Sequence, residues 1–167
     1  MNVSPSLDAT DLRILAQLQQ DAGLTNQDLA QRVHVSPATC LRRVQRLVEA
    51  GIIERRVAIL SAEKLGFGLT TIVEVTLDEQ ATERLDAFEA RAVADVSVQQ
   101  CYRVASGPDF VLILQVADMQ AYQQAANRLF AADANVRNVR SFFSQHRAKF
   151  SPHICLPENL SKDFHMP

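Results

Sequence analysis

The stretch from Ser36 to Arg56, which reads S-P-A-T-C-L-R-R-V-Q-R-L-V-E-A-G-I-I-E-R-R, restricts the possible folds of this chain more than any other feature. Ser36 is a favourable helix N-cap, and Pro37 suits the first helical turn because its missing N–H would have had no intrahelical partner. Gly51 is a residue type that commonly ends a helix. The stretch therefore predicts a capped helix followed by a short, basic turn or strand.

The predicted helix has two faces of different chemistry. Apolar residues recur at three- and four-residue spacing and predict a buried stripe of Leu41, Val44, Leu47 and Val48. Polar residues are predicted to face outward, namely Thr39, Arg42, Arg43 and Arg46. A capped helix with three arginines on its open side, preceded by a short helix and followed by a basic hairpin, is what a reader of the DNA major groove needs.

Two further N-cap patterns lie upstream of this helix. Asp8 and Thr25 stand at N-cap positions, each with an aspartate three residues later. They predict an amphipathic helix over residues 8–20 and a second, short helix before the turn at residues 34–35. Three short helices joined by tight turns match a helix-turn-helix, and the run Ile52–Leu60 predicts the strands of a winged variant.

The second half of the chain alternates between strand and helix patterns. We predict strands over residues 69–77, 96–105, 109–117 and 136–145, and helices over 78–91 and from 118 onward, the latter with Met119 on its inner side. The order βαββαβ predicts a ferredoxin-like α+β domain, a four-stranded antiparallel sheet with two helices on one face. The strand over 110–116 is too apolar for an open face, so we expect a second copy to cover the sheet.

Composition bounds the class of protein. The chain has 167 residues, 47% of them hydrophobic, with a net charge of −2. Five arginines against two glutamates lie between residues 37 and 56, so the positive charge forms a local patch suited to DNA. No apolar run reaches the roughly 18 residues that a membrane span needs, and a signal-peptide pattern is missing, so we expect a cytoplasmic protein with no membrane partner.

Neither cysteine spacing nor histidine context indicates a metal site. Cys40, Cys101 and Cys155 are scattered without CxxC or Cys/His spacing, so we interpret them as reduced structural thiols. His34 has no second ligand nearby and is expected to face solvent or a phosphate. Motifs of catalysis are also missing, including a nucleophile elbow, HExxH and a phosphate loop. We therefore expect no cofactor and no enzymatic activity.

Two segments resemble the leucine-responsive regulator/AsnC (feast/famine) family of bacterial and archaeal transcription factors. They read L-D-A-T-D-L-R-I-L-A-Q-L-Q-Q-D-A and T-N-Q-D-L-A-Q-R-V-H-V-S-P-A-T-C-L-R-R-V-Q-R-L-V-E-A-G-I-I, and the likeness extends over about Leu7–Lys149. We predict a winged helix-turn-helix over residues 1–60, a hinge over 61–68, a ligand-sensing RAM domain over 69–149 and a tail over 150–167 that is loose or crosses a neighbouring subunit. The resemblance implies homodimers through the RAM sheets, often assembled into tetramers or octamers, and a small-molecule effector, usually an amino acid.

The resemblance also places the functional residues. It puts the recognition helix on residues 36–49, and the residues expected to contact double-stranded DNA are Ser36, Thr39, Arg42, Arg43, Arg46, Arg55 and Arg56. The family's G-x-x-D-Y/F turn, which cradles an amino acid, corresponds to G-P-D-F at residues 107–110, one residue shorter and without a donor at Pro108. The expected effector residues are Tyr102, Gly107, Asp109 and Ser141. Glycine, proline and aspartate are also ordinary hairpin residues, so a purely local role stays open for the turn.

These observations predict a sequence-specific transcription regulator whose assembly or DNA affinity responds to an amino acid. A ligand-independent architectural DNA-binding protein is the alternative that the altered turn favours. A metabolic enzyme with a DNA-binding appendage is a third interpretation, for which the sequence offers little. A panel of amino acids tested for heat of binding and for change in assembly separates the first two.

Overall fold

The computed structural model describes residues 7–156, which form two compact units. One unit holds the described residues up to Ile59 together with those from Phe150 onward, and the other spans Leu60–Lys149. The predicted leader over residues 1–6 and the part of the predicted tail beyond residue 156 lie outside the described residues.

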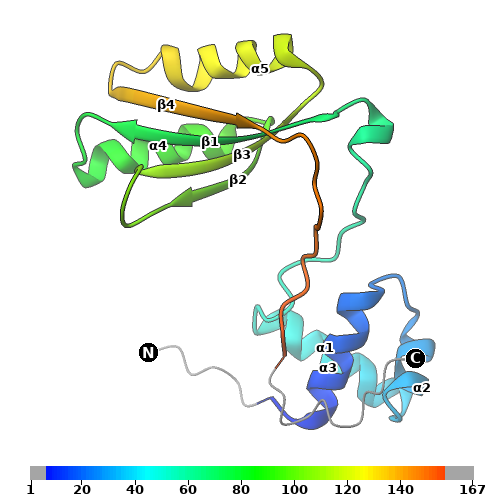
Figure 1. The fold of residues 1–167 in the computed structure, drawn as a ribbon. Helices are drawn as coiled ribbons and strands as arrows, with labels where there is room; N and C mark the ends of the chain where they lie inside the picture. The colour runs from blue at the N-terminus through cyan, green and yellow to red at the C-terminus, as the bar shows by residue number, and fades with distance from the viewer. Residues whose placement is uncertain (1–6, 157–167) are drawn as a thin grey trace. The chain divides into compact units, whose positions relative to one another are not determined.

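The first unit contains three helices, α1 (Ala9–Gln20), α2 (Asn26–Arg32) and α3 (Pro37–Glu49) (Figure 1). All three predicted caps are confirmed, because the side chains of Asp8, Thr25 and Ser36 accept hydrogen bonds from backbone N–H groups of the following turn. Gly51 follows the C-cap of α3 in the left-handed region, with φ of +69°. The predicted helix-turn-helix is thus confirmed.

The core of this unit differs in part from the predicted stripe. Val44 and Leu47 are buried as predicted, but Leu41 and Val48 are each 48% exposed. Cys40 takes their place in the core, since it is fully buried and lies one turn before Val44 and two turns before Leu47. The stripe was wrong because a thiol counts as a polar residue in a simple pattern although it packs as a small apolar group.

The predicted wing strands do not form. Residues 54–60 carry neither helix nor strand, and Val57, Ile59 and Leu60 are more than 60% exposed. A strand needs a neighbour to satisfy its backbone N–H and C=O groups, and the four strands described here pair only with one another, in the other unit.

The described part of the C-terminal tail lies against helix α1 of its own chain. The amide of Gln19 accepts from Ile154 N at 2.8 Å and donates to Ile154 O at 3.3 Å. Leu156 packs on the core of the helical unit. These contacts replace the loose or neighbour-crossing tail that the sequence predicted, as far as residue 156.

The second unit has the predicted order βαββαβ. Its elements, after a short 3₁₀ turn at Glu63–Leu65, are β1 (Leu69–Leu77), α4 (Thr82–Ala94), β2 (Val98–Arg103), β3 (Phe110–Val116), α5 (Met119–Ala126), which continues as a π-helical turn over Asn127–Ala131, and β4 (Val136–Phe143). The sheet order is β2-β3-β1-β4, with every pair antiparallel. Helix α4 begins later than predicted because the N–H groups of Asp78 and Glu79 bond to Asn135 instead.

The two faces of the sheet have different environments. Alternate residues of β1 and β3 are buried with Phe88 of α4 and Leu129 beyond α5, which forms the core of the unit. The other face, which we call the open face, exposes Ile72, Tyr102 and Phe142 by 39%, 53% and 44%. Met119 was predicted to point inward, but it is exposed at the beginning of α5.

Candidate nucleic-acid interface and ligand pocket

Helix α3 presents its N-terminus to solvent with the cap in place. The hydroxyl of Ser36 accepts from Thr39 N at 3.2 Å and donates to the Thr39 hydroxyl at 2.9 Å. Ser36 is exposed and Thr39 is half-buried. Free N–H groups and the dipole at a helix N-terminus favour an anion, so this end of α3 suits a DNA phosphate.

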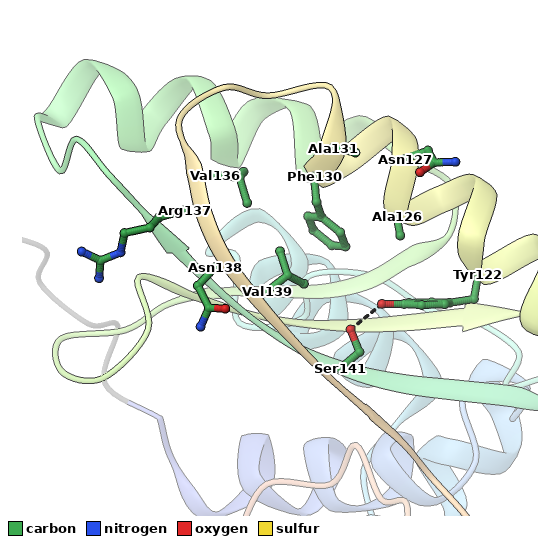
Figure 2. A pocket seen from close by; sticks show the side chains of 10 residues that line it. All are labelled: Tyr122, Ala126, Asn127, Phe130, Ala131, Val136, Arg137, Asn138, Val139 and Ser141. Carbon is green, nitrogen blue, oxygen red and sulfur yellow. Dashed lines mark hydrogen bonds between the residues drawn. The ribbon is translucent and has the colours of Figure 1, made fainter.

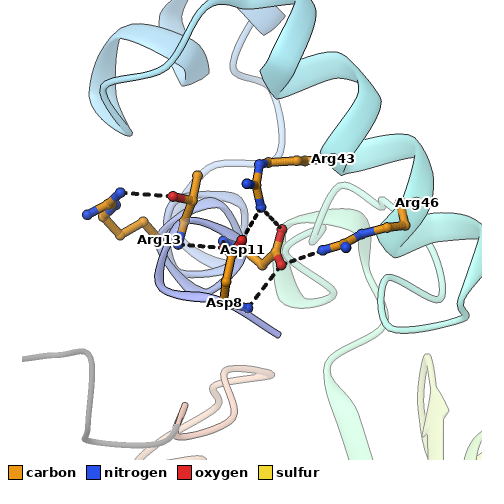
Figure 3. Close-up of polar contacts among 6 residues, drawn as sticks. Asp8, Asp11, Arg13, Arg43 and Arg46 are labelled. Carbon is orange, nitrogen blue, oxygen red and sulfur yellow. Dashed lines mark hydrogen bonds and ion pairs between the residues drawn. The ribbon is translucent and has the colours of Figure 1, made fainter. Parts of the chain in front are cut away.

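The arginines of α3 divide into two groups, which the sequence did not predict. Figure 3 shows Arg43 and Arg46 reaching from α3 toward Asp11 in the first turn of α1. Nη1 of Arg43 lies 2.9 Å from Oδ1 of Asp11 and 2.6 Å from Oδ2 of Asp8, and Nη2 of Arg46 donates to the other oxygen of Asp11. Asp11 has no exposed surface.

These ion pairs change the local electrostatics. The hydrogen bond from the backbone N–H of Asp11 holds the pKa of Asp8 below its ordinary value. Desolvation of the carboxylate acts to raise this pKa, and Arg43 lowers it further. The same pairs raise the pKa of Arg43, whose hydrogen bonds to Asp8 and Asp11 are the main cause. The predicted outward face is therefore wrong for Arg43, whose side chain is only 22% exposed, while Arg46 is half-exposed but already paired.

The remaining predicted DNA-contacting arginines stay available. Arg42, Arg55 and Arg56 are exposed and make no ion pair with any residue in the range 7–156. Gln45 is exposed one turn after Arg42 and was missed, because a lone glutamine in an arginine-rich helix gives no charge signal. Its chemistry could have found it, since glutamine is a standard reader of adenine.

The four predicted effector residues do not come together in one chain. Gly107 has φ of +90° in the turn before β3, and Oδ2 of Asp109 accepts from Leu77 N at 2.7 Å, so the turn is tied to the end of β1. Tyr102 lies on the open face, where its hydroxyl donates to Gln100. Ser141 lies on the opposite, helix-covered face of edge strand β4.

Ser141 opens onto a pocket of about 390 Å³ between the α5 segment and β4 (Figure 2). One wall is apolar and includes Phe130 and Val139. The hydroxyls of Tyr122 and Ser141 hydrogen-bond to each other at one end. Asn127, Arg137 and Asn138 add polar groups to the lining. An apolar wall with a few polar groups is typical of a small-molecule site.

The described residues contain no cluster of histidine, cysteine or carboxylate side chains that could hold a metal ion. Cys40, Cys101 and Cys155 are free thiols, and burial raises the pKa of Cys40 and of Cys101. Across residues 7–156, no helix has both the length and the apolar content for crossing a membrane.

The fold and these two surfaces define a helix-turn-helix protein that carries a second, ferredoxin-like domain. Residues 7–54 match the family model described as winged helix-turn-helix DNA-binding. Residues 70–154 match the model of the Lrp/AsnC ligand binding domain. The chain belongs to the Lrp/AsnC family of DNA-binding transcriptional regulators.

Similar proteins support this assignment over most of the chain. A leucine-responsive regulatory protein from Rhizobium meliloti is 36% identical, covering 89% of this chain and 96% of the relative. The crystal structure of an AsnC family transcriptional regulator from Agrobacterium tumefaciens has a TM-score of 0.83 at 32% identity, over 92% of this chain and 98% of the other. A transcriptional regulator from Neisseria meningitidis, crystallised as an L-Met complex, gives 0.83 at 31% identity over the same shares.

Proposed function

We propose that this family member is a cytoplasmic, sequence-specific transcription regulator whose assembly or DNA affinity responds to an amino acid. It acts by binding and not by catalysis, in line with its relatives, which are named as regulators. The observation that carries the effector proposal is the pocket between the α5 segment and β4, in a domain that matches the family's ligand-binding model. The Neisseria relative with L-Met supports an amino acid as the ligand class.

The lining of the pocket suits the two ends of an amino acid. Phe130 and Val139 offer an apolar wall to a side chain, and the hydroxyls of Tyr122 and Ser141 offer donors and acceptors to polar groups. Arg137 lies at the rim of the pocket with its side chain directed outward (Figure 2), and its weak pairing with Asp78 at 4.0 Å leaves it free to turn toward a ligand carboxylate. A volume of about 390 Å³ is within the usual range for small ligands.

The predicted DNA-contacting and effector residues differ in how well their positions in the structure support the proposed roles. Ser36, Thr39, Arg42, Arg55 and Arg56 are accessible for DNA contact, whereas the ion pairs to Asp11 weaken the case for Arg43 and Arg46. Of the effector set, Ser141 has the best support. Gly107, Asp109 and Tyr102 can join it only if a second copy brings its own residues 102–109 to the pocket.

The open face supports the proposed homodimer. Ile72 lies between Ile113 and Phe142 in the register of β1 with its two neighbours, which makes an apolar strip across the sheet. Glu74 and Arg140 pair at 3.2 Å beside the strip. An apolar centre with a charged margin is typical of a protein interface, so a second copy covers this face. The resemblance to the family implies that such dimers assemble further into tetramers or octamers.

Calorimetry and light scattering against the twenty amino acids, L-methionine and L-leucine included, test the proposal. We expect at least one amino acid to give heat and to change the molar mass. Ala131→Trp, at an exposed position of the pocket lining, is expected to abolish both effects, and Ala134→Trp, exposed but outside the lining, to leave them. No heat and no change of assembly with any amino acid would favour the ligand-independent architectural role.

A further inference from the structure

The exposed crest of α3 carries residues that the predicted basic face did not include. Cys40, Val44 and Leu47 are buried on one side of the helix. With 3.6 residues per turn, the opposite side of the helix is formed by positions 38, 42, 45 and 49. All four are exposed, and we call this side the crest of α3. Arg43 and Arg46 lie toward the flank that contacts α1, where Asp8 and Asp11 hold them.

We infer that Gln45, together with Arg42, reads base edges in the major groove, whereas Arg43 and Arg46 are held out of base contact by Asp11. Arg42 and Gln45 are three residues apart, so their side chains are neighbours on one helix face. Neither side chain makes a hydrogen bond or an ion pair within residues 7–156, so the amide and the guanidinium are both free to bind DNA.

The chemistry of the crest specifies the bases. A glutamine amide bonds in a bidentate way to N6 and N7 of adenine, and an arginine to O6 and N7 of guanine. Leu41, 48% exposed and one turn from Gln45, adds an apolar group suited to a thymine methyl. Glu49 also lies on the crest, but in the last turn of α3 and one turn farther than Gln45 from the N-terminal end that enters the groove in a helix-turn-helix.

The paired arginines are poorly suited to the same task. Base readout by Arg43 would break its bonds to two carboxylates, and it would leave Asp11 buried with fewer partners. A bond from Arg43 to a base would replace bonds to carboxylates that exist before DNA binds. The net gain in binding free energy would therefore be small. Asp11 is therefore a positioning residue that fixes the flank of α3 and leaves the crest to read sequence.

Selection of the full-length protein on duplexes with a randomised 25-base-pair core, followed by sequencing of the bound pool, tests this inference. The wild type is expected to enrich a motif with adenine at one position of each half-site. Gln45→Ala should lose that preference and bind the wild-type consensus about 5- to 150-fold more weakly, the equivalent of one bidentate pair. Gln45→Arg should change the preferred base to guanine, an outcome that a merely structural residue would not produce.

Arg46→Gln serves as the control on the paired flank and is expected to keep the motif. The inference is overturned if the wild type enriches no motif, if both Gln45 variants keep the wild-type motif, or if the base preference changes in Arg46→Gln instead. Circular dichroism confirms that each variant is folded before selection. The test depends on DNA binding alone, so a failure of the proposed amino-acid response would not affect it.

Discussion

Removing the charge of Asp11 is the sharpest test of how the helical unit holds its recognition helix. Asp11→Asn keeps the shape of the side chain but removes the carboxylate, which accepts from Arg43 at 2.9 Å, from Asp8 N at 3.1 Å and from Arg46. The site has no exposed surface, so water cannot take over these bonds without rearrangement.

The structure sets the size of the effect. Breaking a buried ion pair by removing one partner costs about 3–5 kcal/mol. Here Arg46 is 50% exposed and can rehydrate, and Arg43 keeps Asp8 at 2.6 Å, so part of the cost is avoided. We therefore expect Asp11→Asn to lower the free energy of unfolding of the helical unit by about 2–3 kcal/mol.

A matched control exists in the next helix. Asp28 occupies the same position in α2 as Asp11 in α1, three residues after the N-cap, but it is exposed and makes no ion pair with described residues. Asp28→Asn loses the same interaction with the helix dipole and is expected to cost about 0.5 kcal/mol. Similar losses for the two variants would refute the reasoning, because the arginines would then add nothing beyond the dipole.

The assay can separate the two units. The chain has no tryptophan, and both of its tyrosines, Tyr102 and Tyr122, lie in the second unit. Urea unfolding followed by circular dichroism at 222 nm reports helices of both units, whereas near-ultraviolet dichroism of the tyrosines reports the second alone. Asp11→Asn should move the first signal and leave the second unchanged.

Three further predictions concern other parts of the molecule. The pKa of Asp8 lies below its ordinary 3.8, chiefly through the backbone N–H of Asp11, so its contribution to stability is complete at about pH 6, well above the unfolded-state pKa, and is lost as the pH falls through the folded-state pKa. The stability difference between wild type and Asp8→Asn in urea should then shrink between about pH 6 and about pH 2.5, and a constant difference would contradict this. Leu156→Ala should destabilise the helical unit by about 1–2 kcal/mol in thermal unfolding if the tail packs on α1 in solution, and an unchanged melting temperature would count against that packing. Gly107→Ala should lower the free energy of unfolding of the second unit by about 1 kcal/mol in tyrosine-monitored urea unfolding. The cost comes from the backbone φ of +90° alone, because an added Cβ meets nothing within 4 Å. No loss would mean that the turn adopts another backbone conformation.

Local sequence signals predicted much of the fold because their physics is local. The caps at Asp8, Thr25 and Ser36 each need only one side chain and the following turn, and all three formed. The nearly continuous apolar run over residues 110–116 predicted a strand, and β3 forms there and pairs with β1. The βαββαβ order followed from such segments taken together.

What the sequence did not predict depends on contacts between distant segments. Arg43 and Asp11 are 32 residues apart, so no pattern within α3 reveals that the arginine is already paired. The helix pattern alone made all three arginines equivalent, and Gln45 gave no charge signal beside them. The wing at residues 52–60 failed for the same reason, because a strand pattern cannot say whether a neighbour exists to pair with it.

The pairing of Arg43 and Arg46 also bears on why a single helical unit would bind DNA poorly. Because Arg42 is assigned to a base, Arg55 and Arg56 are left to neutralise phosphates, and the logarithm of affinity then falls with the logarithm of salt at a slope of roughly −1.8 per unit, from about −0.9 per phosphate. Two units double this to about −3.6. The proposed dimer therefore doubles the number of phosphate contacts, and it also sets the spacing at which two recognition helices read their half-sites. An effector that binds two assemblies with different affinity changes that spacing, whereas one that binds both equally changes nothing.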